Sequence, residues 1–440
     1  MNPLRKIYCR SFQKLFRIAI PFLPYRKPKI VGSVKDLPAI IHKHKCTRVL
    51  IITDQGITKL GLTKRLEKAL NRDEIPYVLY DQTVANPTTV NVEEALKLYI
   101  QNGCNTIIGF GGGSSMDCAK AVGARAVKPD QSLAQMKGIL KVHRKLPLLI
   151  AVPTTAGTGS ETTLASVITD AETRHKYAIN DFPLIPRYAV LDPKVTLSLP
   201  PFITATTGMD ALTHAVEAFI GNSSTIDTRR DALKAVKLIF ENIDDAYTHG
   251  DDIAARRNML HASFYAGCAF TKSYVGYVHA VAHSLGGQYN VPHGYANAVL
   301  LPMVLREYGS CIHKKLQKLA AAAGVAEKDT PASEAAESFI RAIEEMKVRF
   351  QIGNTIPEIQ ETDIPKLSHY ADKEANPLYP VPRLMDDHEL EKFYYMLMPE
   401  KKTGRDGNLE NEGIENSGIN KDAVSAEIQK EGNKEERTNE

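Results

Sequence analysis

The sequence predicts an α/β domain built on a parallel sheet, followed by an all-α domain. Before about Pro200, short β-branched runs alternate with helical patterns, whereas only long helical patterns follow it. Two loops rich in glycine, serine and threonine also come directly after predicted strands, at the edge where open α/β sheets bind their ligands.

Each predicted element has its own signal. The strands are the β-branched runs Arg48–Thr53, Pro76–Tyr80, Asn105–Phe110 and Leu148–Val152. The later helices have a helical hydrophobic period over Thr204–Ile220, Thr228–Tyr247 and Ile253–Phe270, with more helical pattern to about Met396. We therefore expect an α/β domain over residues 29–198 and a helical domain over residues 199–400.

The two ends differ from the rest of the chain. Residues 1–28 predict a basic amphipathic arm, because cations alternate with apolar side chains and no acidic residue is present. Packing of this arm on the rest of the protein is the first expectation, since Pro21, Pro24 and Pro28 interrupt helix formation. A helix on a membrane surface and a transit peptide are the alternatives. Residues 401–440, which lack aromatic side chains, predict a disordered charged tail.

Composition excludes several classes of function. A formal net charge of +4 over 440 residues is too small, and its cations too dispersed, to indicate a nucleic-acid partner. No apolar run approaches the roughly 18–20 residues of a membrane-spanning helix. The six cysteines are scattered and form no CxxC pair, which favours reduced thiols and a cytoplasmic location.

Two loops and one acid predict a dinucleotide site. The loop GGGSSMDCAK, from Gly111, joins a strand to a helix whose free N–H groups suit a pyrophosphate, although a plain tight turn would look the same. The loop Pro153–Glu161 (PTTAGTGSE) adds threonine hydroxyls after another strand. Asp54, at the end of the first predicted strand, can accept hydrogen bonds from a ribose or cap the helix that follows it.

Five side chains in the second half form a metal-binding pattern. Asp210 and His214 are four residues apart in a helical pattern, and His279 and His283 repeat that spacing. Each pair therefore lies on one helix face. His293 follows at a predicted helix start. A lone histidine in an apolar helix is usually a core residue, but four histidines and one aspartate, in two such pairs and a third element, favour Fe²⁺, Zn²⁺ or Co²⁺.

These motifs resemble the iron-containing (group III) alcohol dehydrogenase family over about Lys29–Met398. The matching stretches are NPT (Asn86–Thr88), GGGSSMDCAK, PTTAGTGSE, GMDALTHAVEA and HAVAHSLGGQYNVPHG. The resemblance implies an α/β dinucleotide-binding domain and a helical metal-binding and substrate domain, a dehydroquinate synthase-like architecture with the active site between them. A dehydroquinate synthase-like lyase activity conflicts with the TTAGTGSE loop and the HxxxH pattern.

The resemblance also implies roles for individual residues. The metal ligands would be Asp210, His214, His279 and His293, and the catalytic proton carrier would be His283. The cofactor contacts would be Asp54, Asn86, Gly112, Gly113, Ser114, Asp117, Thr154, Thr155, Thr158 and Lys176. Phe270 would narrow the substrate channel, and Lys272 stands there where relatives usually have a small polar residue. Glu217 is a candidate hydrogen-bond partner for a histidine ring.

The implied activity is that of a metal-dependent alcohol dehydrogenase or aldehyde reductase. It would transfer hydride between NAD(H) and a short-chain alcohol or aldehyde, with Fe²⁺ polarising the oxygen. Zn²⁺ is the alternative ion, NADP(H) the less favoured cofactor, and a homodimer the expected assembly. One alternative is a hydroxyacid–oxoacid transhydrogenase or another reductase of carboxylated substrates, for which Lys272 is the only hint. A non-catalytic metal- and nucleotide-binding scaffold is the other, which the intact ligands disfavour.

Overall fold

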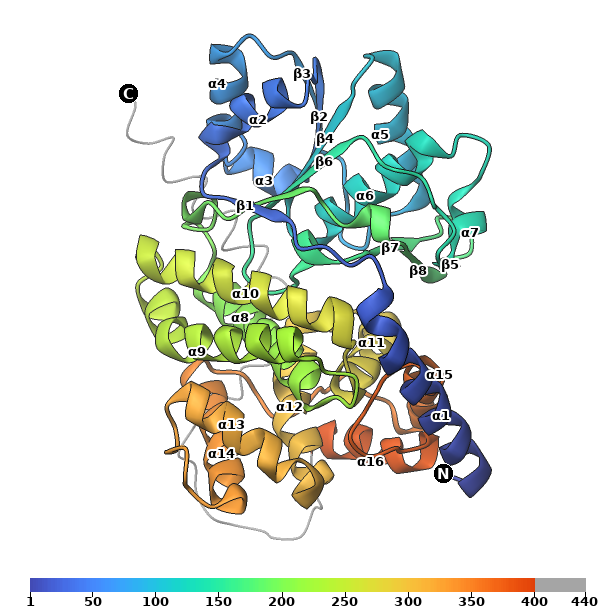
Figure 1. Cartoon of the computed structure of the whole chain (residues 1–440), viewed down its shortest axis with the longest axis vertical. Helices are drawn as coiled ribbons and strands as arrows, with labels where there is room; N and C mark the ends of the chain where they lie inside the picture. The colour runs from blue at the N-terminus through green and yellow to red at the C-terminus, as the bar shows by residue number, and fades with distance from the viewer. Residues whose placement is uncertain (400–440) are drawn as a thin grey trace, which may run out of the picture. The chain divides into compact units, whose positions relative to one another are not determined.

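A computed structural model describes residues Met1–Pro399, so the predicted tail lies outside the described residues. Figure 1 shows the sheet and its covering helices in one half of the described chain and a wholly helical region in the other half. None of the helices in Met1–Pro399 has the length and apolar character needed to cross a membrane.

Six parallel strands form the main sheet, in the order β1-β9-β6-β4-β2-β3. They are β1 (Lys29–Val31), β2 (Val49–Ile52), β3 (Tyr77–Tyr80), β4 (Thr106–Gly111), β6 (Leu148–Pro153) and β9 (Tyr188–Val190). The four predicted strands are confirmed as β2, β3, β4 and β6. Every residue of β2 and β4 is buried, because helices cover both faces, which explains their continuous apolar runs.

A second, three-stranded sheet was not expected. It has the order β5-β8-β7, from β5 (Gly138–Ile139), β7 (Ala165–Thr169) and β8 (Lys176–Asn180). Strands β7 and β8 alternate between buried and half-buried or exposed residues. The short strands β1, β5 and β9 have two or three residues each, too few for a readable hydrophobic period.

Helices surround the main sheet. They are α2 (Leu37–Lys43), α3 (Gln55–Lys59), α4 (Lys64–Arg72), α5 (Thr89–Gln101), α6 (Gly113–Val127) and α7 (Leu133–Met136). Helix α6 follows β4 directly and packs closely against it, because Gly109 has no side chain: a Cβ there would lie 2.9 Å from the Ala119 Cβ. This contact fixes the start of α6 at the carboxyl end of the sheet.

After Pro200 the described chain is helical. The helices are α8 (Pro201–Ile220), α9 (Ile226–Thr248), α10 (Ile253–Ser273), α11 (Tyr277–Tyr289), α12 (His293–Tyr308), α13 (His313–Ala323), α14 (Ala332–Arg349), α15 (Ile364–Ala375) and α16 (Asp387–Leu397). The three helices predicted with bounds are confirmed as α8, α9 and α10. Helix α8 packs against α9, α10 and α12 and is buried on nearly every side from Thr204 onward. It is therefore the centre of the helical region.

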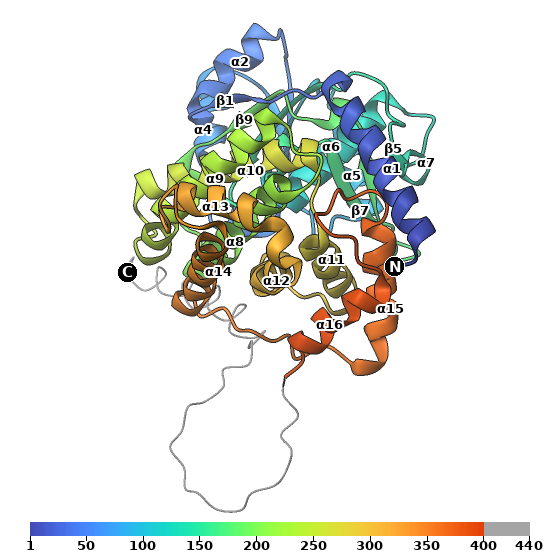
Figure 2. The same cartoon turned by 60° about the horizontal axis from the view of Figure 1, so that its bottom comes forward.

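The N-terminal arm is a helix, α1 (Pro3–Ala19), followed by the 3₁₀ turn η1 (Ile20–Phe22). Helix α1 lies beside α15 in both orientations of the molecule (Figures 1 and 2). The Arg5 guanidinium pairs with Asp372 in α15 at 2.6 Å. Pro21, Pro24 and Pro28 all follow the end of α1, so it remains one uninterrupted helix.

Two glycines join the loop Pro153–Glu161 to the helical region. Gly159 has a φ of 59°, which favours glycine, and a Cβ on it would lie 2.8 Å from the Gly267 Cα in α10. A Cβ on Gly267 would in turn lie 2.2 Å from the Thr162 hydroxyl oxygen. The loop and α10 therefore meet backbone to backbone.

We expect Gly267→Ala to lower the thermal unfolding midpoint, because its methyl group must displace the Thr162 hydroxyl or the Gly159 backbone. A destabilisation of about 1–3 kcal/mol is typical of such overpacking. Gly287→Ala in α11 is the matched control, since a Cβ there meets nothing within 4 Å and alanine favours a helix. Equal midpoints for the two variants in thermal melts followed by circular dichroism would contradict this close contact.

Candidate metal centre and cofactor cavity

Four of the five predicted metal-binding side chains come together. Asp210 and His214 project from α8 one turn apart, His279 comes from α11, and His293 is the first residue of α12. One ligand atom from each lies within 4.8 Å of the others. Three separate helices thus supply one carboxylate and three imidazoles, a donor set that suits a transition-metal ion.

The imidazoles face the Asp210 carboxylate. From its Oδ1 atom, His293 Nε2 is 3.5 Å away, and His214 Nδ1 and His279 Nε2 are each 3.9 Å away. The Nδ1 atom of His214 is buried and has no hydrogen-bond partner in Met1–Pro399. A buried nitrogen left without a partner is costly unless something binds it, so this orphaned atom fits a cation at the centre of the four residues.

The surroundings of the three imidazoles favour their neutral form. Burial lowers the pKa of His279 well below its ordinary value, and the neighbouring histidines act in the same direction. Burial also lowers the pKa of His214, and that of His293 to about 4, although Asp210 opposes both shifts. All three rings are therefore neutral near pH 7, the form in which imidazole binds a metal.

Glu217, one helical turn beyond His214 in α8, orients His279. Its Oε2 atom lies 2.6 Å from His279 Nδ1, and the carboxylate also accepts the N–H groups of Gly276 at 2.8 Å and Val278 at 2.9 Å. This confirms the hypothesis that Glu217 partners a histidine ring. Because Nδ1–H points at Glu217, the Nε2 lone pair of His279 is left for the metal cluster.

Asn297 is a member of this cluster that the sequence interpretation missed. It lies one turn after His293 in α12, and its amide nitrogen is 2.7 Å from Asp210 Oδ1. The same nitrogen lies 3.1 Å from His293 Nε2 and 3.3 Å from His279 Nε2. The available signal was the spacing of four residues from His293, which places both side chains on one helix face.

His283 stands beside the cluster and outside it. Its ring stacks on that of His293, with centroids 5.1 Å apart, and its Nδ1 lies 2.6 Å from Glu374 Oε1 in α15. The Tyr379 hydroxyl donates to the same carboxylate oxygen at 2.6 Å. Burial opposes the charged ring, but Glu374 outweighs it and raises the pKa of His283. No local sequence signal indicated Glu374 or Tyr379, which are distant in the chain.

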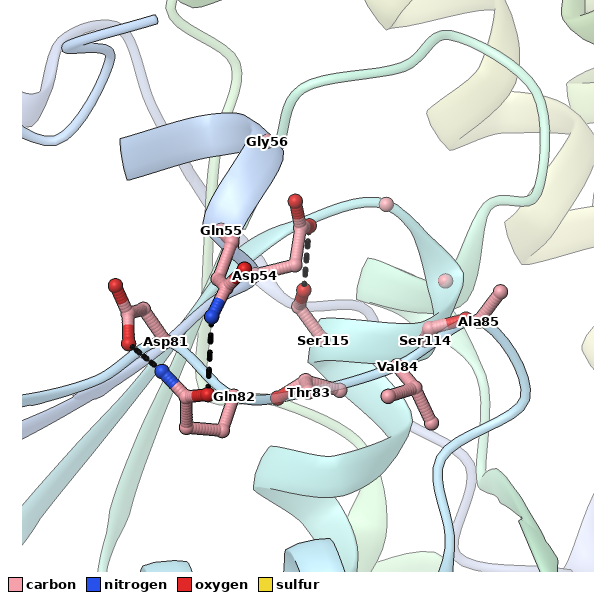
Figure 3. Close-up of a pocket in the computed structure, with 12 residues that line it drawn as sticks. Asp54, Gln55, Gly56, Asp81, Gln82, Thr83, Val84, Ala85, Ser114 and Ser115 are labelled. Carbon is pink, nitrogen blue, oxygen red and sulfur yellow. Dashed lines mark hydrogen bonds between the residues drawn. The ribbon is translucent and has the colours of Figure 1, made fainter. Parts of the chain in front are cut away.

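The first glycine loop borders a cavity of about 510 Å³ at the carboxyl ends of β2, β3 and β4 (Figure 3). The predicted cofactor residues Asp54, Gly112, Gly113 and Ser114 all line it. Asp54 Oδ1 caps α3 by accepting from Ile57 N at 3.1 Å, and Oδ2 accepts from the Ser115 hydroxyl at 3.3 Å. Asp81, which was not anticipated, places a second carboxylate in the same lining.

Four more predicted cofactor residues surround the glycine loop. Thr155 and Thr158 approach it, since Cβ atoms on Gly112 and Gly113 would lie 3.9 and 3.4 Å from their side chains. Asn86 N donates to the Ser114 hydroxyl at 3.2 Å, and Lys176 Nζ donates to Asn86 Oδ1 at 2.7 Å. Asn86, Thr155, Thr158 and Lys176 therefore all lie near the first glycine loop or bond to a residue that does.

Thr154 and Asp117 are held by contacts with neighbouring segments. Thr154 is buried, and its N–H donates to the Gly111 carbonyl at 3.0 Å. The Asp117 carboxylate accepts from the Ser160 hydroxyl and from Val167 N, and it does not line the cavity. Its contacts connect α6 to the second loop and to β7.

Lys120 in α6 is a buried cation that had no predicted role. Its ammonium donates to the Ser160 hydroxyl at 3.0 Å, the Thr163 hydroxyl at 2.7 Å and the Ala165 carbonyl at 2.8 Å. Burial lowers its pKa to about 8, and Asp117, 3.9 Å away, opposes that shift. The helix after the first loop is thereby attached to the segment that contains the second.

The two predicted channel residues have different surroundings. Phe270 stacks on the His214 ring with centroids 4.1 Å apart, so it borders the metal cluster directly. The Lys272 ammonium instead lies over the Tyr25 ring of the N-terminal arm, 5.9 Å from its centroid. All six cysteines are free, as expected from their spacing.

A parallel sheet with a nucleotide-sized cavity, followed by helices that hold an Asp–His₃ cluster, is the arrangement of a metal-dependent dehydrogenase. Residues 30–193 match the family model for iron-containing alcohol dehydrogenase, and residues 204–398 match the model for the C-terminal part of that family. The chain therefore belongs to the iron-containing alcohol dehydrogenase family, as its motifs had indicated.

Individual relatives agree with this assignment. A 1,3-propanediol dehydrogenase from Klebsiella pneumoniae is 34% identical over 385 residues, which is 87% of this chain and 98% of the relative. A solved 1,3-propanediol oxidoreductase superposes with a TM-score of 0.81 at 33% identity, covering 85% of this chain and 98% of the other. A sulfoacetaldehyde reductase from Bifidobacterium kashiwanohense, solved with NAD⁺, gives 0.76 at 28% identity and covers 86% and 99%.

We expect Glu217→Gln to weaken metal binding about 10- to 100-fold, because an amide cannot accept three N–H groups as a carboxylate does. The measurement is the dissociation constant for Zn²⁺ in a competition titration with a chelator. Glu241→Gln, on the exposed side of α9, removes an equal charge and should leave the constant unchanged. An unchanged constant in Glu217→Gln would show that the hydrogen bond to His279 does not support metal binding.

Proposed function

We propose that this protein is a metal-dependent alcohol dehydrogenase and aldehyde reductase that uses NAD(H) and short-chain substrates. The observation that carries the proposal is the connection between its two sites. Within the loop Pro153–Glu161, Gly157 lies against α8, where a Cβ on it would come within 2.7 Å of the Thr207 carbonyl oxygen. Thr207 is three residues before Asp210, so the loop beside the cofactor cavity also borders the metal cluster.

Asp210, His214, His279 and His293 would hold the ion, and the donor set suits Fe²⁺ or Zn²⁺. Such an ion, when bound, supplies Lewis acidity to an alcohol or carbonyl oxygen, while the nicotinamide gives or takes the hydride. Glu217 and Asn297 fix the directions of His279 and Asp210 through hydrogen bonds.

His283 would move the proton that accompanies hydride transfer. Its Nδ1 is tied to Glu374, so Nε2 is the atom left to face a substrate oxygen. The Glu374 carboxylate stabilises the imidazolium that forms when His283 accepts a proton from an alcohol. Tyr379 donates to Glu374 and thereby holds that carboxylate in place.

The cavity supports NAD(H) as the cofactor. Asp54 and Asp81 both line it, and carboxylates accept the hydroxyls of an adenosine ribose but repel a 2′-phosphate. Gly112, Gly113 and the start of α6 would receive the pyrophosphate, with Ser114, Thr155 and Thr158 around it. We place Asp117 and Thr154 in supporting positions, since Ser160 and Val167 donate to the Asp117 carboxylate and Thr154 is buried with its N–H bonded to Gly111.

Small uncharged substrates fit the surroundings of the cluster better than carboxylated ones. Phe270 presents an aromatic ring beside His214, whereas the Lys272 ammonium is directed at Tyr25 in the arm. We also propose that residues 29–198 bind the cofactor and that residues 199–400 bind the metal and the substrate.

The test is reduction of short aldehydes by NADH with protein purified without oxygen and loaded with Fe²⁺ or Zn²⁺. Activity should disappear on chelation and return with the ion. His283→Ala should keep the metal, as measured by elemental analysis, but lose about 10²–10⁴-fold in kcat. His388→Ala, on the exposed surface of α16, is the matched control. Loss of metal in His283→Ala would instead make this histidine a ligand, and inactivity of every loaded preparation would overturn the proposed function.

Asp54→Asn tests cofactor selection with little damage to the fold. Asparagine can still cap α3 and accept from Ser115, because it is as good a helix cap as aspartate. It lacks the charge that repels a 2′-phosphate, so we expect the ratio of kcat/KM for NADH over NADPH to fall about tenfold or more. If the ratio stays constant in steady-state assays, Asp54 acts only as a helix cap.

A further inference from the structure

Helix α1 is attached to the protein mainly by polar side chains, together with the buried Cys9 and with Phe16, which packs on Tyr274. Gln13 is buried and its amide donates to the Tyr379 carbonyl at 2.7 Å, while the Arg10 guanidinium donates to the carbonyls of Val381 and Pro382 at 2.7 and 2.8 Å. Arg5 pairs with Asp372. An amphipathic helix of a globular protein normally buries its apolar stripe, so this arrangement is inverted.

The apolar stripe of α1 is exposed as a result. Leu4, Ile7, Leu15 and Ile18 recur at helical spacing, and Leu4 is 78% exposed, Leu15 69% and Ile7 64%. Tyr8 adds to the same face, and Phe22 in η1 is exposed beyond its end. No described residue covers this face, which we call the α1 apolar face (Leu4, Ile7, Tyr8, Leu15 and Ile18). Contiguous exposed apolar surface of this kind marks a site of interaction.

The charged side chains of α1 itself are all positive. Lys6, Lys14 and Arg17 are exposed, and within Met1–Pro399 none of them is in an ion pair. Helix α1 itself contains no acidic residue. Apolar residues flanked by free cations, without acids, are the composition of helices that lie in the headgroup region of an anionic bilayer.

A second copy of this chain is a poorer occupant. A symmetric dimer formed through the α1 apolar face would bring Lys6, Lys14 and Arg17 of one copy near the same cations of the other. Like charges at such an interface repel, whereas an anionic surface would attract them.

The arm after α1 continues the positive charge. Leu23 and Pro24 line a cavity of about 1310 Å³ together with Lys29, Lys145 and Arg187. Within the described residues these three cations form no ion pair, and the one acid in the lining, Asp181, already accepts from backbone N–H groups. The segment that follows α1 therefore borders further cations that are free of ion pairs within Met1–Pro399.

We propose that α1 docks this protein on an anionic phospholipid surface. The α1 apolar face enters the boundary between headgroups and acyl chains, and Lys6, Lys14 and Arg17 contact the lipid phosphates. Arg5, Arg10 and Gln13 hold the helix on the body of the protein, so docking requires no unfolding. This proposal is independent of the catalytic one.

The experiment is flotation of the full chain with phosphatidylcholine vesicles that contain or lack phosphatidylserine. We expect flotation only with phosphatidylserine, and less of it as salt is raised, because salt screens the cations. The double variant I7D/L15D should lose binding at least about tenfold, since charged side chains do not enter the lipid boundary. The control I226D/V348D makes the same two changes at exposed apolar positions on α9 and α14.

The variant K6E/K14E keeps the apolar face but reverses charge, and it too should lose binding to phosphatidylserine vesicles. Circular dichroism and aldehyde reduction should match wild type in all variants, which separates docking from folding and catalysis. Failure of wild type to float, or equal flotation of I7D/L15D, would overturn the proposal. A further outcome would overturn it: wild type does not float with vesicles, and I7D/L15D has a lower molar mass than wild type in light scattering. A second copy of the chain would then cover this face.

Discussion

The metal cluster depends on the hydrogen bonds that the Glu217 carboxylate accepts. Burial disfavours the charged form of this carboxylate and raises its pKa to about 7. Three N–H groups donate to it and partly offset the cost of burying the charge. Two of those groups belong to Gly276 and Val278, at the start of α11, and the third is on His279. Gly276 must lack a side chain, because a Cβ would lie 2.7 Å from a Glu217 oxygen. One carboxylate thus fixes both where α11 begins and which nitrogen of His279 faces Asp210.

Close contacts also join the cofactor cavity to the metal cluster. Gly157 and Gly159 bring the second loop against α8 and α10, and Lys120 attaches the first loop's helix to the segment that follows. A shift of that loop would move both the cavity wall and the helix that carries Asp210. The N-terminal arm adds a third connection, since Gln13 contacts the backbone of Tyr379, whose hydroxyl holds Glu374 against His283.

The central strands and the first three helices of the helical region could be predicted because their signals are local. Buried parallel strands are continuous apolar runs, and helix faces repeat every three to four residues. Strands β7 and β8 escaped prediction because their alternation is short, and Glu374 because nothing near it in the chain marks it. The family resemblance supplied the separation of His283 from the ligands, which spacing alone left open, and the structure agrees in placing it beside the Asp210 group.

The sequence by itself determined what helix geometry determines: that Asp210 and His214, or His279 and His283, share a helix face, and that two glycine loops follow strands. It also determined that α1 is basic and amphipathic. Only the tertiary structure decided which imidazole turns toward Asp210, which turns toward Glu374, and that α1 packs mainly by polar side chains. These outcomes depend on contacts between residues tens to hundreds of positions apart, and such contacts are selected by the packing of whole helices rather than by any local pattern.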